Sequence, residues 1–110
     1  MMVGTATLEV SGPGAADRAA QLHAELSAHA GRGDSVSAVE VRRSAEMVVA
    51  VIGLVFAGID TAKTIWDWWH SRRGEGTTVT VLLADGTRLD LADIDQDRLE
   101  IAFQQATSQD

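Results

Sequence analysis

Residues 5–10 alternate between polar and apolar side chains, which is the pattern of a β-strand with one buried face. The Ser-Gly-Pro-Gly sequence that follows is typical of a chain turn. Residues 15–30 then change to helical spacing, with Leu22 and Leu26 four positions apart on a narrow apolar stripe. Residues 36–41 are short, β-branched and alternating again. The first third of the chain is therefore predicted to be strand, helix, strand.

The stretch from Ser44 to His70 contains no proline and is the most apolar part of the chain. Its first half, residues 47–59, is apolar on every side, and its second half gains a polar strip. A helix that is apolar all round is usually buried or covered by a partner. We predict one long apolar helix over about residues 44–72, roughly 40 Å in length.

Residues 77–91 predict a β-hairpin, because two alternating stretches flank Asp85-Gly86, a pair that favours a two-residue turn with positive φ. Asp93, followed three residues later by Gln96, resembles a helix-capping box. Apolar residues then recur at helical spacing, which predicts a last helix over about residues 94–106.

These elements predict a single α+β domain over residues 1–110, in the order β-α-β-α-β-β-α. We expect a mixed four-stranded sheet with the helices on one face and the long apolar helix at the centre. The third and fourth strands should pair antiparallel, and the first should pair near the second. A crossover from the first strand to the second within one sheet would be parallel and right-handed.

Composition narrows the function classes. The 110 residues include 16 acidic and 9 basic side chains, for a formal charge of −7, which argues against nucleic-acid binding because phosphate affinity comes mainly from Lys and Arg. The chain has no cysteine, which removes disulfides and thiolate chemistry. No signal peptide is visible, and the expected location is the cytoplasm.

No residue pattern here predicts catalysis, a metal or a cofactor. The acidic residues of 90–100 begin like an EF-hand loop, but Arg98 stands where that loop needs Gly and Gln104 where it needs a bidentate Glu. Carboxylates at a helix N-terminus explain the run better. The three histidines have no cluster of carboxylates or thiols beside them at the spacing of a metal site. The sequence also has no glycine-rich phosphate loop and no nucleophile elbow. We therefore expect a protein that is not an enzyme.

The long helix offers the one candidate interface. Trp68 lies about 100° from Trp69 around a helix, so the two cannot easily share one burial site, and Trp68 is the best candidate anchor. Small residues beside it would permit close helix packing. The hypothetical interface residues are Val51, Gly53, Leu54, Ala57, Gly58, Thr61, Ile65, Trp68 and Arg72.

Residues 46–106 resemble the effector-associated constant component family, small domains of actinobacterial conflict systems. The matching stretches are VVAVIGLVFAGI, WDWWHSRR, TTVTVLL, the Asp85-Gly86 turn with its LDL return, and DIDQDRLEIAFQQA. The resemblance implies a non-catalytic partner of variable effectors, either protease-like or nucleotide-dependent.

The expected function is thus an adaptor of a bacterial conflict system that acts in defence or signalling. It would self-associate as a homo-oligomer or dock a protein effector through the long helix. The alternative is a membrane-acting effector whose helix, residues 47–69, inserts into a bilayer, as the tryptophans and arginines at its end would permit. Its charge-free part is only about 20 Å long against a hydrocarbon core of about 30 Å, which favours the adaptor.

Overall fold

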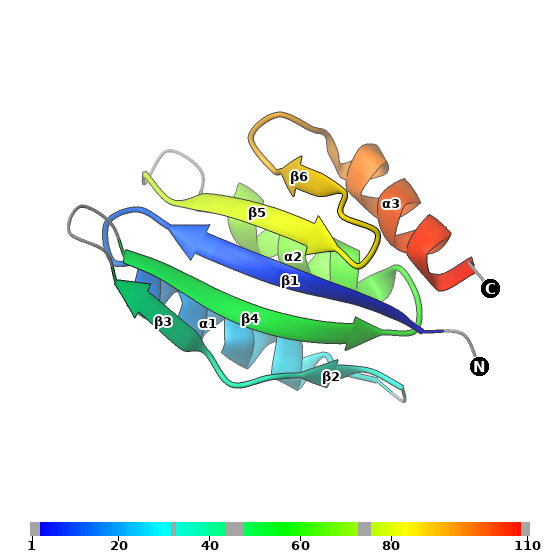
Figure 1. Ribbon diagram of the computed structural model, residues 1–110, viewed down its shortest axis with the longest axis horizontal. Coiled ribbons are helices and arrows are strands. Elements are labelled where there is room, and N and C mark those ends of the chain that lie inside the picture. The colour runs from blue at the N-terminus through cyan, green and yellow to red at the C-terminus, as the bar shows by residue number, and fades with distance from the viewer. Residues whose placement is uncertain (1–2, 32, 44–47, 73–75, 109–110) are drawn as a thin grey trace.

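The computed structural model describes residues 3–31, 33–43, 48–72 and 76–108. Within them an antiparallel sheet of six strands packs against three helices (Figure 1). The elements are β1 (Gly4–Ser11), α1 (Ala15–Ala28), β2 (Ser35–Val36), β3 (Glu40–Arg43), β4 (Val48–Phe56), α2 (Asp60–His70), β5 (Thr78–Leu83), β6 (Arg88–Asp90) and α3 (Gln96–Ser108).

The strand order is β2-β4-β1-β5-β6, with β3 also paired to β4. β1 is therefore central, and β4 and β5 flank it, both antiparallel to it. If β2 and β3 count as one interrupted strand, the chain up to β5 is a β-α-β-β-α-β arrangement in which each α-helix connects two strands separated by a third. This is the split βαβ connectivity of ferredoxin-like folds. β6 and α3 extend it.

All three helices lie on the same side of the sheet. Figure 1 shows α1 and α2 behind the strands, with the other face towards the viewer. α3 joins this layer through Phe103, whose ring stacks on that of Phe56 with centroids 4.3 Å apart. Both phenylalanines are fully buried. The core is therefore a single layer between one sheet face and the helices.

Several predicted elements are confirmed. β1 turns Ala6, Leu8 and Val10 into the core, and α1 buries Leu22 and Leu26, as the spacing predicted. The hairpin β5–β6 is antiparallel, and the last helix is α3. The single α+β domain with its helices on one face is thus what the structure contains.

The predicted long helix is wrong. Val48–Phe56 is the strand β4, and only Asp60–His70 is helical. The helix prediction rested on a run that is apolar on every side. β4 is apolar on both faces, because the side chains on one face are buried in the core and those on the other face are mostly valines. Residues 44–47 lie outside the described residues.

The predicted sheet is wrong in three details. The described pairings are all antiparallel rather than mixed, and the strands number six rather than four. The first and second predicted strands are not paired, because β4 lies between β1 and β3. β1 and β3 are both antiparallel to β4, so they run parallel to each other. This is the direction expected for a crossover from the first predicted strand to the second.

Two local predictions need correction. The hairpin turn has three loop residues, because the Leu83 amide donates to the Thr87 carbonyl. Within this loop only Gly86 has positive φ (+94°). This is a type I turn followed by a left-handed glycine rather than a two-residue turn. α3 is capped by Asp95, whose Oδ1 accepts the Arg98 amide at 2.8 Å, and not by Asp93.

Candidate interaction surface

The face of the sheet opposite the helices carries an apolar stripe along β4. Alternation along the strand sends Ile52 and Leu54 into the core, so Val49, Val51 and Val55 project from the other face. All three valines are half-buried, and none of the described helices covers this face (Figure 1). Solvent-facing sides of antiparallel sheets are usually polar, which makes three valines on one strand unusual.

The neighbours of this stripe follow from the pairing register. Thr5 and Thr7 of β1 lie beside Val55 and Gly53, and Leu82 of β5 lies beside Thr7. These side chains are short or apolar, whereas Val51 lies between Glu9 of β1 and Glu40 of β3. We call Val49, Val51, Val55, Thr7 and Leu82 the open-face patch.

Two ion pairs border the open-face patch. Glu9 Oε1 of β1 lies 3.4 Å from Arg88 Nη1 of β6, without the alignment of a hydrogen bond. On the other side, Arg42 Nε lies 3.7 Å from Glu40 Oε1 within β3. Partly exposed pairs of this kind contribute little stability, about 0–1 kcal/mol. Their effect is to place both signs of charge around an apolar centre.

Gly53 interrupts the stripe, and Ser37 lies over it. The Gly53 amide donates to Ser37 Oγ at 2.7 Å, and the Ser37 amide donates to the Gly53 carbonyl at 2.9 Å. A Cβ atom at Gly53 would stand 3.0 Å from that hydroxyl oxygen. The glycine therefore makes room for the side chain that completes the pairing of β4 with the edge of the sheet.

The predicted interface residues do not form one surface. Val51 and Gly53 lie on the open face, whereas Leu54, Ile65 and Trp68 are buried on the helix side. The remaining members lie beyond the end of β4 or along α2 and just after it, and all are half-buried: Ala57, Gly58, Thr61 and Arg72. Residues predicted to line one helix are thus divided between two faces of a sheet. The valines at positions 49 and 55 were missed, although their β-branched alternation was the available signal.

Trp68 belongs to the core. Only 4% of it is exposed, and the Arg72 guanidinium covers its ring at 4.8 Å from the centroid. Arg72 is held there because its Nε donates to Gln21 Oε1 at 3.2 Å and its Nη1 to the Trp68 carbonyl at 3.1 Å. Trp68 Nε1 has no hydrogen-bond partner among the described residues. Trp69 is also buried, so the two neighbouring tryptophans share the core, and Trp66 is half-buried against Trp69.

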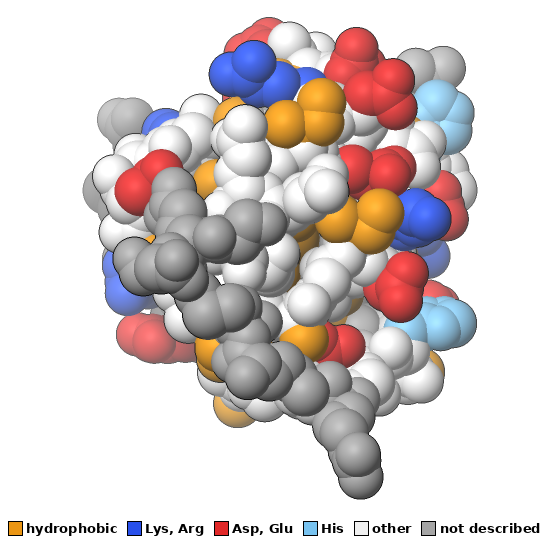
Figure 2. Space-filling model, turned by 90° about the vertical axis from the view of Figure 1, so that its right-hand side faces the viewer, with side chains coloured by type: hydrophobic (Ala, Val, Ile, Leu, Met, Phe, Trp, Pro, Cys, Tyr) orange, Lys and Arg blue, Asp and Glu red, His pale blue; other side chains and the backbone are white. Residues whose placement is uncertain are grey.

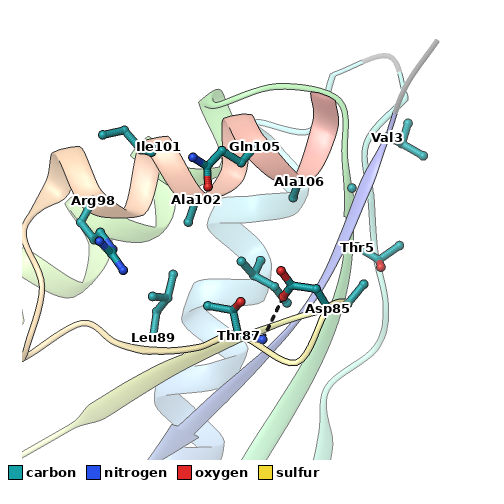
Figure 3. Close-up of a pocket in the computed structure, with 13 residues that line it drawn as sticks. Val3, Thr5, Asp85, Thr87, Leu89, Arg98, Ile101, Ala102, Gln105 and Ala106 are labelled. Atoms are coloured by element: carbon teal, nitrogen blue, oxygen red, sulfur yellow. Dashed lines mark hydrogen bonds between the residues drawn. The ribbon is translucent and has the colours of Figure 1, made fainter. Parts of the chain in front are cut away.

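A hollow of about 470 Å³ lies between α3, the β5–β6 turn and the start of β1 (Figure 3). Ala102 and Arg98 face it from α3, whereas Ile101 points away. The carboxylate of Asp85 also lines the hollow, and its Oδ1 accepts a hydrogen bond from the Thr87 amide at 2.9 Å. Hydrogen bonds from the Thr87 side chain and then from its backbone lower the pKa of Asp85. The carboxylate is therefore engaged in the turn.

The end of the molecule that carries this hollow has a mixed surface. Figure 2 shows small, separate hydrophobic patches between acidic and other polar side chains. The exposed Ile101 and Val3 belong to this end. By contrast, the valines of the open-face patch follow one another along a single strand.

The titratable residues do not converge on a reactive centre in the described part of the chain. His29 pairs with Glu25 at 3.6 Å, and His70 stacks on Trp66. Within the same residues no three His, Asp or Glu side chains are grouped so that they could hold a metal ion. Among the described helices, none has the length and hydrophobicity to span a bilayer. The continuous helix on which the membrane alternative depended is replaced by β4 and α2.

Comparisons with family models, with known proteins and with solved structures find no match to this chain. The resemblance to the effector-associated constant component family therefore rests on the sequence motifs. One of these motifs, the apolar stretch expected to be a helix, is the strand β4.

Proposed function

We propose that this chain is a non-enzymatic adaptor that binds a protein partner through the open-face patch. The observation that supports it most is the row of half-buried valines on the side of β4 that the helices leave uncovered. Burying the rest of these side chains would add hydrophobic free energy, at about 25 cal/mol for each Å². The charged residues at both borders would form the polar rim typical of protein interfaces.

The motif resemblance supports a bacterial conflict system in the cytoplasm as the setting. It makes the partner an effector of protease-like or nucleotide-dependent type. The net charge of −7 favours a protein partner over nucleic acid. This proposal keeps the adaptor role predicted from the sequence and moves its surface from the long helix to the sheet.

The test is co-purification of the tagged chain with effector proteins encoded beside it. Val55→Lys and Leu82→Lys each place a charge on the open-face patch, and we expect either to reduce recovery of the effector at least tenfold. Ala20→Lys adds the same charge at an exposed position of α1 and should leave recovery unchanged. If both patch variants retain the effector as well as the unaltered chain does, the open face is not the docking surface.

A further inference from the structure

β3 forms an exposed edge of the sheet. Its only strand partner in the described structure is β4, and all four of its residues are exposed. Val41, at its centre, is 40% exposed, which is high for a large apolar side chain. An unpaired strand edge presents amide and carbonyl groups that can pair with another strand.

The charges of β3 determine how two copies of it can pair. Glu40 and Arg42 project from the open face of the sheet, and their side chains are 69% and 66% exposed. Two identical strands can pair antiparallel across a twofold axis perpendicular to the sheet. Directly opposite side chains must then lie on the same face, so the axis must run midway between the two copies of one residue.

One such register exists for each of the four residues of β3. An axis at Glu40 opposes two carboxylates, and an axis at Arg42 or Arg43 opposes two guanidinium groups. Like charges placed directly opposite each other destabilise a sheet. An axis through Val41 instead sets each Glu40 opposite Arg42 of the other copy, twice in the dimer, with the two Val41 side chains in contact.

We propose that the partner of this edge is a second copy of the chain, paired antiparallel through β3 with Val41 at the twofold axis. Charged edge residues usually oppose such pairing, but here the two signs are complementary in one register only. The proposal goes beyond the proposed function, because it uses the edge of the sheet and leaves Val55 and Leu82 free. The two open faces would form one continuous surface, so a dimer could present two docking sites side by side.

The paired strand would be short. Val36 pairs with Leu54, and Glu40 pairs with Val51. The edge segment therefore advances four residues where β4 advances three. This one-residue bulge interrupts the edge and confines regular pairing to β3. With the axis at Val41, only residues 40–42 of each copy pair within β3. This contact is small for a protein interface, so we expect a weak dimer with a dissociation constant in the high micromolar range.

Sedimentation equilibrium on charge-reversed variants tests the register. Glu40→Arg and Arg42→Glu each replace both attractive pairs of the dimer by repulsive ones, and each should raise the dissociation constant at least tenfold. An equimolar mixture of the two variants should dimerise again, because both arginines of the first variant then face the two glutamates of the second. Circular dichroism melts should show the unaltered chain and both variants equally folded, since both side chains are exposed.

The outcomes separate this proposal from the proposed function. Val55→Lys should leave the dimer intact while it disrupts effector binding. The β3 dimer is refuted if the unaltered chain stays monomeric up to about 1 mM, if either charge variant dimerises as well as the unaltered chain, or if the mixture stays monomeric. A dimer that Val55→Lys abolishes and charge reversal leaves unchanged would mean that the copies meet through their open faces.

Discussion

At the scale of single residues, one hydroxyl group joins the edge of the sheet to β4. Ser37 Oγ accepts the Gly53 amide in a place where regular pairing would use a backbone carbonyl. We expect Ser37→Ala to lower the free energy of unfolding by about 0.5–1.5 kcal/mol, the net value of one hydrogen bond. Urea denaturation measures it, and Ser35→Ala, at an exposed position of β2, serves as the control.

The same pair should be coupled in a double-mutant cycle. Gly53→Ala brings a methyl group to within 3.0 Å of the Ser37 hydroxyl, so it should cost more in the unaltered chain than in the Ser37→Ala background. We expect a coupling of about 0.5–1 kcal/mol. Equal effects in the two backgrounds would mean that the hydroxyl moves aside freely.

Asp85 should make stability depend on pH at the acid end. Its pKa in the folded protein is lowered from 3.8 because Thr87 hydrogen-bonds the carboxylate. The charged form is thus favoured by folding, so its contribution is complete above pH 3.8 and is lost as the pH falls through the folded pKa. Thr87→Val removes the hydroxyl and should raise the pKa of Asp85 in an NMR titration. Thr78→Val should leave it unchanged, and an unmoved Asp85 in Thr87→Val would contradict the prediction.

At the scale of elements, α2 is held by its tryptophans. Trp68→Ala should lower the free energy of unfolding by about 3–5 kcal/mol, because a buried ring leaves a cavity when it is removed. Trp68→Phe keeps an aromatic ring under Arg72 and removes an N–H group that has no described partner, so it should cost much less. Thermal and urea unfolding compare the two. A small loss in Trp68→Ala would indicate that the side chain is an exposed anchor after all.

Local pattern predicted most elements that have one polar face, although the strand predicted over residues 36–41 is divided into β2 and β3. β1, α1, the hairpin and α3 each alternate or repeat between apolar and polar positions, and each was found. β4 has no polar face, and a strand apolar on both sides has the same composition as a buried helix. Five of its nine residues are Val or Ile, whose branched side chains favour strands, and Gly58 follows its end. That enrichment was the signal against a helix.

The candidate surface could not be predicted without knowing the order of the strands in the sheet. The stripe on β4 becomes a surface only because β1 lies on one side of it and the edge segment on the other, and no local pattern predicts which strands are neighbours. The capping residue illustrates the same limit on a smaller scale. Asp93 and Asp95 are both suitable caps, and the hydrogen bond that selects Asp95 depends on where the chain leaves β6.

At the scale of the whole molecule, protection against hydrogen exchange should follow the strand order. β1 is paired on both sides over most of its length, so its amides should exchange most slowly. The amides of β2, β3 and β6, each paired to one described strand, should exchange fastest among the strands. NMR exchange rates on dilute protein test this ranking. Protection of β3 equal to that of β1 under these conditions would contradict it.

The bulge beside Ser37 also has a consequence for how the length of this chain can vary. Four residue steps on the edge already match three on β4, so deleting one residue there would leave every later side chain on its present face. The same deletion inside β4 would exchange its core and open faces, because side chains alternate along a strand. Relatives of this protein should therefore tolerate the loss of one residue between Val36 and Glu40, and retain a constant length from Val48 to Phe56.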